Sequence, residues 1–236
     1  MTNDHTYTDD TVAQARRSVL EAALPNVAFD GWTDRTLAEA TRESGVEPKL
    51  SRMAFPRGGV DLALAFHHAN DDALADRLAT ADLAGMRFSD RVAHAVALRL
   101  EIVAPQREAV RRAAALFALP IHAADGARAV WHTADTIWTA LGDSSDDLNW
   151  YTKRMTLSAV YSSCVLYWLG DDSPGQIDTR SFIDRRIDDV MQFEKVKAAV
   201  RENPLGRAFM AGPGRLLSGI RAPGAASSDL PGRWRH

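Results

Sequence analysis

The chain is poor in cysteine and has no long apolar run. Cys164 is the one cysteine among 236 residues, so a disulfide framework is excluded and a reducing compartment is expected. The longest mostly apolar stretch, 157–169, has 13 residues, whereas a membrane-spanning helix needs about 20. The N-terminus is polar and acidic and lacks the apolar core of a signal peptide. We therefore expect a cytoplasmic protein.

Strand signals and catalytic motifs are missing as well. No turn dipeptide separates alternating apolar runs, and helical periodicity dominates the chain. The chain has no G-x-S-x-G, P-loop or G-x-G-x-x-G motif, and no paired Glu-x-x-His motifs of a di-iron bundle. Cys164 lies in an apolar run, which favours a buried structural thiol over a nucleophile. The sequence predicts an all-α protein that needs no cofactor, and the missing motifs argue against a di-iron hydroxylase.

Histidine and aspartate recur at helical spacing in two places. The segment "HHANDD" (67–72) pairs each histidine with an aspartate four residues later. Such pairs could bind a metal ion, but a site needs three or four converging ligands, so we expect a solvated helix face and no metal. His132 and Asp135 are three residues apart beside tryptophans. A hydrogen bond between them is the simpler interpretation, with a polar group inside a ligand cavity as the alternative.

Nine helices follow from the apolar periodicity and the positions of glycine and proline. Pro105 should divide 89–118 into two helices or kink it. Three short helices with a turn at Gly45 open the chain, in the order of a helix-turn-helix head of TetR-type regulators. The predicted ranges are 11–28, 34–44, 47–54, 59–80, 89–103, 105–118, 124–141, 146–169 and 179–202.

The charge of this head does not suit DNA. Residues 10–68 carry seven basic and eight acidic side chains, whereas a DNA reader needs an excess of cations to contact phosphates. We expect no nucleic-acid partner and a head that is retained as structure. A ligand-responsive TetR-type transcription regulator is an alternative function for the chain, and an enzyme is a further one.

Five longer segments carry a more specific resemblance: "FDGWTDRTLAEATRESGV", "AFPRGGVDL", "AVWHTADTIWTALGDSSDDLNWYTKR", "YSSCVLYWLGD" and "FIDRRIDDVMQFEKVK". In this order, over about residues 15–207, they resemble the ubiquinone (coenzyme Q) biosynthesis accessory family, which has a TetR-like fold. The resemblance implies a non-enzymatic homodimer that binds an isoprenoid or quinone-like lipid in an apolar cavity. It also implies a partner, the hydroxylase that acts on demethoxyubiquinone, to which the lipid is presented.

The resemblance and the composition together predict how the chain is divided. The head is followed by one helical lipid-binding domain and then by a short segment that contacts a membrane. The expected boundaries are a disordered N-terminus (1–10), a helix-turn-helix-like head (11–58), a lipid-binding domain (59–203), an amphipathic membrane-contact segment (204–222) and a disordered tail (223–236).

Large aromatic rings and small neighbours gather on the helices of the second domain. Four of the six tryptophans lie between 131 and 168, and helix 146–169 is apolar nearly all round in its second half. A solid core and a lipid cavity both fit this pattern, and the resemblance favours the cavity. The predicted lipid-binding residues are Val96, Leu100, Trp131, Trp138, Leu157, Tyr161, Cys164 and Trp168.

The start of helix 146–169 combines acids with aromatic and basic side chains. The acids favour the positive end of the helix dipole, and the next turn carries residue types that contribute most to protein interfaces. In the resembled family, an exposed patch at this position docks the hydroxylase. The matching residues, and our predicted docking surface, are Asp147, Trp150, Tyr151 and Arg154.

A basic segment near the C-terminus has the pattern of a membrane contact. Residues 201–236 carry six arginines against two acids, and the chain is therefore predicted to be peripheral to the inner membrane. The "GPG" at 212–214 should break a continuous helix, and a flexible tail is the alternative. The residues predicted to enter the membrane interface are Leu205, Phe209, Leu216 and Ile220.

Overall fold

The computed structural model describes residues 8–146 and 148–202, with side chains up to residue 192. Every regular element in these ranges is a helix, which confirms the all-α prediction. All predicted helix boundaries lie within two residues of the observed ones. The elements are α1 (Asp9–Asp30), α2 (Asp34–Glu43), α3 (Pro48–Ala54), α4 (Gly59–Thr80), α5 (Phe88–Val103), η1 (Ala104–Gln106), α6 (Arg107–Phe117), α7 (Ala123–Ala140), α8 (Leu148–Leu169), η2 (Pro174–Gln176) and α9 (Ile177–Glu202).

Local chemistry explains where the first helices begin and end. The side chain of Thr33 caps α2 by accepting a hydrogen bond of 3.1 Å from the backbone N–H of Thr36. Gly45 has a φ of 68° in the turn before α3, a conformation that favours glycine. Pro105 lies in η1, so the predicted division of 89–118 into two helices is correct.

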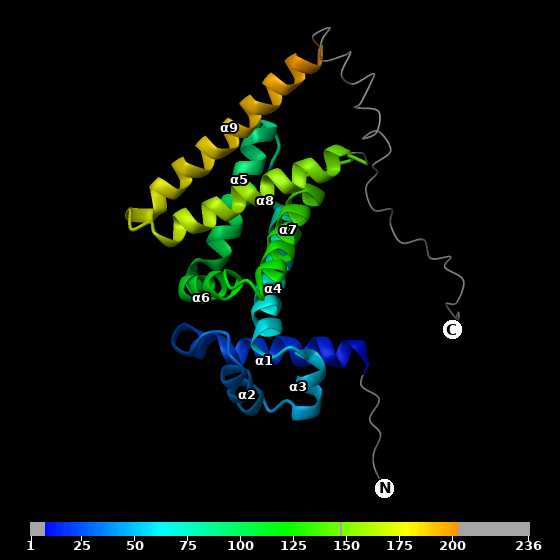
Figure 1. The fold of residues 1–236 in the computed structure, drawn as a ribbon, viewed down its shortest axis with the longest axis vertical. Coiled ribbons are helices and arrows are strands. Elements are labelled where there is room, and N and C mark those ends of the chain that lie inside the picture. Colours follow the sequence, from blue (N-terminus) through cyan, green and yellow to red (C-terminus); the bar gives the residue numbers. More distant parts are fainter. Residues whose placement is uncertain (1–7, 147, 203–236) are drawn as a thin grey trace, which may run out of the picture.

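The head and the second domain lie at opposite ends of α4. Figure 1 shows α1, α2 and α3 grouped at one end, with α4 leading away from them and α7 running beside it. Helix α8 packs against α7, and α9 packs against both α5 and α8. The buried core is continuous from Val19 and Phe55 in the head to Trp168 on α8. Within the described ranges no helix is long and apolar enough to cross a membrane.

Helix α6 joins the head to the second domain. Arg107 and Arg111 donate hydrogen bonds of 2.7–2.8 Å to backbone carbonyls at the C-terminal end of α8 and the turn after it. Arg112 donates to a carbonyl of α1 at 3.2 Å. The indole N–H of Trp32, from the head, donates to the carbonyl oxygen of Ala109 at 3.0 Å. Helix α6 is therefore hydrogen-bonded to the head on one side and to the end of α8 on the other, through its arginines and one backbone carbonyl.

Candidate functional site

An apolar groove lies between α6, α7 and α8. Its volume is about 590 Å³, within the range of roughly 300–1,000 Å³ usual for small-molecule sites. Met155 and Leu166 on α8 border it and are 59% and 66% exposed. Its apolar lining also comprises Val110, Ala113, Ala114, Phe117, Ala118, Ala123, Gly126, Ala127, Ala129, Val130, Trp131, Ala159 and Val165.

Small side chains on α6 and α7 give the groove its width. Ala113, Ala114 and Ala127 leave space where larger residues would meet across it. Gly126 also lets α6 approach α7, because a Cβ atom at this position would lie 2.7 Å from the Cβ of Phe117. The groove depends on small residues at these positions rather than on a gap between helices.

Four polar side chains line the groove among its apolar ones: His67, Ser158, Tyr161 and Ser162. His67 Nε2 lies 2.8 Å from the carbonyl oxygen of Ala129, to which it donates. The hydroxyl of Ser158 is buried and has no hydrogen-bond partner within the described ranges. Burial raises the pKa of Tyr161, which keeps its phenol neutral. A ligand with one polar group and an apolar body would match this lining.

The predicted lipid-binding residues do not form one surface. Trp131 and Tyr161 line the groove. Trp138 and Leu157 line a separate hollow of about 180 Å³ between α5, α8 and α9. The other four are core residues that line neither of these two cavities, because each packs against neighbouring helices with almost no exposed area: Val96, Leu100, Cys164 and Trp168.

The first turns of α8 are anchored by a buried arginine. Arg154 is 2% exposed; its Nε lies 2.5 Å from Asp135 Oδ1 and its Nη1 lies 3.0 Å from Asp143 Oδ2. Lys153 also contacts Asp143 at 2.7 Å. Burial opposes ionisation of Asp143, but the hydrogen bonds from Lys153, Ser145 and Arg154 outweigh it and lower its pKa to about 2.

Arg154 therefore cannot contact a partner as the docking prediction supposed. Its guanidinium is enclosed by carboxylates and lies over the ring of Trp150, 4.0 Å from the ring centroid. The residue positions Trp150 instead of offering its own charge. Asp147, the fourth predicted docking residue, lies outside the described residues.

Trp150 and Tyr151 belong to an aromatic cluster that reaches the groove. Their ring centroids are 4.8 Å apart in an edge-to-face arrangement. Trp131, which lines the groove, lies 5.8 Å from Trp150 and 6.4 Å from Tyr151. Both residues of the cluster on α8 are partly exposed. The predicted docking surface and the groove thus share one wall.

A buried carboxylate ties α4 to α5 and α7. Asp71 Oδ1 accepts hydrogen bonds from Arg99 Nε at 2.8 Å and Thr133 Oγ1 at 2.9 Å. Asp71 Oδ2 lies 2.8 Å from His132 Nδ1 and 3.4 Å from His67 Nε2. Burial alone would raise the pKa of Asp71, but these hydrogen bonds and the charge of Arg99 hold it well below its usual range. The expected hydrogen bond from His132 thus goes to Asp71, on another helix, and not to Asp135.

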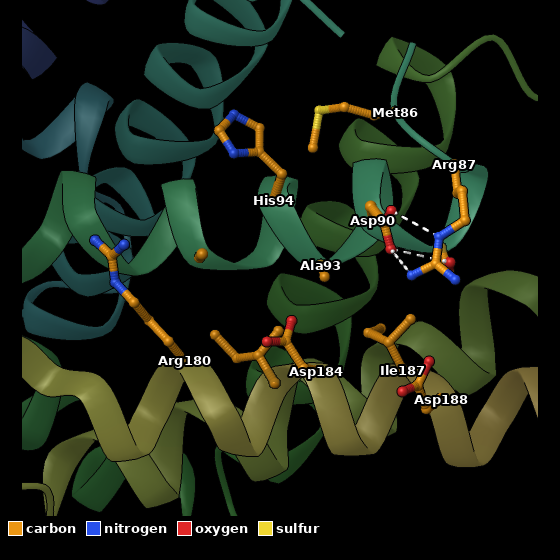
Figure 2. A pocket seen from close by; sticks show the side chains of 12 residues that line it. Met86, Arg87, Asp90, Ala93, His94, Arg180, Asp184, Ile187 and Asp188 are labelled. Carbon is orange, nitrogen blue, oxygen red and sulfur yellow. Dashed lines mark hydrogen bonds and ion pairs between the residues drawn. The ribbon is translucent and has the colours of Figure 1, made fainter.

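A further hollow of about 560 Å³ lies between α5 and α9 (Figure 2). Figure 2 shows the ion pair of Arg87 with Asp90 on α5, and Asp184 and Asp188 on the facing side of α9. Arg180 lies at its other end and is paired with Glu101. This charged lining does not suit an isoprenoid tail, and none of the predicted lipid-binding residues lies in it.

Comparison with known proteins identifies the relatives of this chain. Residues 123–194 match the COQ9 family model. The ubiquinone biosynthesis protein COQ9 of Drosophila melanogaster is 32% identical over 201 residues, which cover 81% of this chain and 61% of the fly protein. The chain is a homologue of the COQ9 proteins. The human COQ9 protein is 30% identical over 84% of this chain and 64% of its own length, so the family resemblance of the sequence segments is confirmed.

The COQ9 homologue spans less than two thirds of the length of these relatives. Their names designate mitochondrial proteins, so the expectation of a cytoplasmic location was wrong. It rested on the single cysteine, the lack of a long apolar run and the polar N-terminus. The scarcity of cysteine indicates a reducing environment without distinguishing one compartment from another.

A solved structure confirms the fold of the COQ9 homologue. The TetR transcriptional regulator from Nitrosomonas europaea ATCC 19718 aligns with a TM-score of 0.57 and 19% sequence identity. The alignment covers 74% of this chain and 97% of the regulator. At this identity the likeness concerns the fold alone, and it confirms the TetR-like arrangement predicted from the head.

The predicted membrane-contact residues, all within 205–220, lie outside the described residues.

Proposed function

We propose that this protein acts in ubiquinone biosynthesis as a non-enzymatic lipid-binding protein that presents isoprenoid quinone precursors to the demethoxyubiquinone hydroxylase. The observation that carries the proposal is the apolar groove between α6, α7 and α8. The names of the COQ9 relatives supply the pathway. In this proposal the protein catalyses no reaction. It moves the precursor from the bilayer into its own apolar groove.

The mechanism is a transfer of apolar surface from the bilayer to the groove. Each CH₂ group that leaves an apolar environment for water costs about 0.8 kcal/mol, so an isoprenoid tail cannot leave a membrane unprotected. The groove offers apolar contacts along its length and few polar groups to desolvate. The unpartnered hydroxyl of Ser158 can donate a hydrogen bond to a ring oxygen of the precursor.

The partner surface is proposed at the first turns of α8. Trp150 and Tyr151 are large, partly exposed rings held in place by Arg154 and Trp131. Preorganised aromatic side chains lose little conformational entropy on binding and are frequent interface anchors. Since Trp131 also lines the groove, a docked hydroxylase would lie next to the bound precursor.

Mass spectrometry of the purified full-length chain under native conditions tests lipid binding directly. We expect a co-purified isoprenoid lipid in the wild type. Ala127 lines the groove and is exposed, so Ala127→Trp should fill it and remove the lipid. Ala124 is exposed on the same helix outside the groove, and Ala124→Trp should retain the lipid. Equal lipid content in the two variants would refute the groove as the binding site.

Co-purification with the hydroxylase tests the docking surface. Trp150→Ala should retain fold and lipid but lose most of the co-purified hydroxylase, because it removes the ring at the centre of the cluster. Tyr167, which is 38% exposed near the other end of α8, provides the matched control Tyr167→Ala. Wild-type levels of hydroxylase with Trp150→Ala would exclude this surface.

Two further parts of the proposal concern the membrane and the oligomeric state. The segment 205–221 would contact the membrane through its apolar residues, with arginines at the headgroups. Deleting 203–236 should then reduce flotation with anionic liposomes, and unchanged flotation would exclude the segment. The family resemblance predicts a homodimer, and sedimentation equilibrium of the full-length chain measures this.

A ligand-responsive regulator is the second candidate, because the head has the helix-turn-helix arrangement of α2, the Gly45 turn and α3. The net charge of −1 over residues 10–68 opposes it. Binding to DNA that weakens steeply with salt would favour this candidate, and the absence of such binding at low salt would eliminate it.

A further inference from the structure

The structure brings together a histidine and aspartate cluster that no single helix could form. His68 and Asp71 come from α4, and His132 comes from α7. One ligand atom from each lies within 4.8 Å of the other two. The His68 and His132 rings meet edge to face, with centroids 4.5 Å apart. Helical spacing on α4 supplies two candidate ligands, and the packing of α7 against α4 supplies the third.

We propose that His68, Asp71 and His132 bind one divalent transition-metal ion. Two imidazoles and a carboxylate form a ligand set used by zinc and related ions, which leaves a fourth position to water. Tetrahedral zinc with ligands at about 2.0–2.1 Å spaces its ligand atoms about 3.4 Å apart. A side-chain adjustment on the order of 1 Å closes this cluster around such an ion.

Asp71 is oriented for this role by groups that are not ligands. Arg99 and Thr133 both donate to Oδ1, at 2.8 and 2.9 Å, and so fix the carboxylate plane. The other oxygen, Oδ2, faces His132 Nδ1 at 2.8 Å. An incoming ion would displace the proton shared between these two atoms. Such hydrogen bonds behind a ligand are what holds metal-binding side chains in a usable orientation.

His68 is the candidate ligand without a protein partner. Within residues 8–146 and 148–202 its ring nitrogens form no hydrogen bond or ion pair, although the residue is partly buried. The buried polar atoms that lack a partner do not include these nitrogens, so water reaches them. An ion can therefore replace water on one nitrogen while His132 and Asp71 complete the set.

His68 gives the cluster a route to solvent. It lies on the wall of a hollow of about 750 Å³ between α1 and α4. Three aspartates and three arginines line this hollow, so its formal charges balance: Asp61, Asp72, Asp76, Arg16, Arg17 and Arg57. The route therefore admits a cation without concentrating it, and binding depends on the three ligands against the opposing charge of Arg99 beside Asp71.

Titration of the chelator-treated, full-length chain with Co²⁺ tests the proposal. We expect one equivalent to produce visible absorption bands, which Zn²⁺ then removes by displacement. His68→Gln and His132→Gln should each weaken Co²⁺ binding at least tenfold. His94 is exposed on α5, away from the cluster, so His94→Gln should bind Co²⁺ like the wild type.

The variants are chosen so that loss of binding is not loss of fold. His68 makes no hydrogen bond to lose, and glutamine at 132 can still donate to Asp71. Thermal unfolding of the metal-free variants should therefore match the wild type, while Zn²⁺ raises the Tm of the wild type but not that of His68→Gln or His132→Gln. Absence of saturable Co²⁺ binding to the wild type, or wild-type Co²⁺ affinity in either His68→Gln or His132→Gln, would overturn the proposal.

Discussion

Replacing Arg154 by methionine should destabilise the protein by about 4 kcal/mol at pH 7. Arg154 and Asp143 are both nearly inaccessible, with side chains 3% and 2% exposed. Methionine conserves much of the side-chain length but leaves Asp143 without one of its two cationic partners. Asp135 is 41% exposed, so water solvates it after the change and its loss adds little.

The magnitude follows from what remains around Asp143. Breaking a buried ion pair by removing one partner costs about 3–5 kcal/mol, because the other charge stays buried. Lys153, at 2.7 Å from Asp143 Oδ1, keeps part of the compensation, so the lower end of this range applies. The lost contact between the guanidinium and the Trp150 ring, at 4.0 Å, adds about 1 kcal/mol.

A double-mutant cycle measured by urea unfolding isolates the pair. The two single variants should each lower the free energy of unfolding. We expect the sum of the losses in Arg154→Met and Asp143→Asn to exceed the loss in the double variant by at least about 1 kcal/mol, because the effects of residues in one ion-pair network are not additive. The exposed pair of Arg87 and Asp90 gives a control, and Arg87→Met should cost less than about 0.5 kcal/mol. A loss below about 1 kcal/mol in Arg154→Met, or strict additivity, would refute the anchoring role.

Three more outcomes follow from the geometry. The pKa of Asp143 is lowered to about 2 from 3.8, so the stability that its carboxylate contributes is present above pH 4 and is lost as the pH falls towards 2. In an acid titration, the free energy of unfolding of Asp143→Asn should therefore decline less steeply than that of the wild type. Identical pH profiles for the two proteins would contradict this. Gly126→Val should cost about 1–3 kcal/mol in urea unfolding because its Cβ would meet Phe117 at 2.7 Å, and an unchanged midpoint would show that the helices separate freely. Burial raises the pKa of Cys164 to about 11 from 9.0, and this lowers the thiolate fraction about 100-fold. A thiol reagent at pH 8 should therefore label the native chain far more slowly than the urea-unfolded chain. Equal labelling rates would contradict a closed core around Cys164.

The helices could be predicted from sequence because their signals are local. Thr33, Gly45 and Pro105 each act within a few residues of their own position, by capping, by permitting a left-handed turn and by breaking the hydrogen-bond ladder. Periodicity then fixed the extent of each helix to within two residues. The division into a head and a larger domain followed from the order of these elements.

The site was harder to predict, because a groove depends on which helices meet. The apolar stripe of α8 correctly indicated a central helix, but it did not separate Tyr161, which faces the groove, from Cys164 and Trp168, which are enclosed by the core. Helix α6 supplies a whole wall and was missed. Its alanines at 113 and 114 are the signal that was present, and they become meaningful only once α7 and α8 are known to face them.

The partners of two charged or polar side chains were also predicted wrongly, because these partners come from other elements of the chain. Arg154 was expected at the surface because the family resemblance implies an exposed docking patch at the start of this helix. Asp135 and Asp143 enclose it from α7 and the loop that follows. Likewise, His132 was expected to pair with its own helix and instead reaches Asp71 on α4. Pairing between helices is set by packing, which the spacing along one helix does not report.

The position of α6 determines how the two parts of the chain should unfold. This helix is a wall of the groove, yet its arginines and the carbonyl of Ala109 bond to α1, to Trp32 and to the end of α8. Loss of the head would remove the partners of Arg112 and of the Ala109 carbonyl, whereas the arginines bonded to the end of α8 would keep theirs. We therefore expect the head and the groove to unfold in one cooperative transition, because the head holds one side of the helix that forms a wall of the groove.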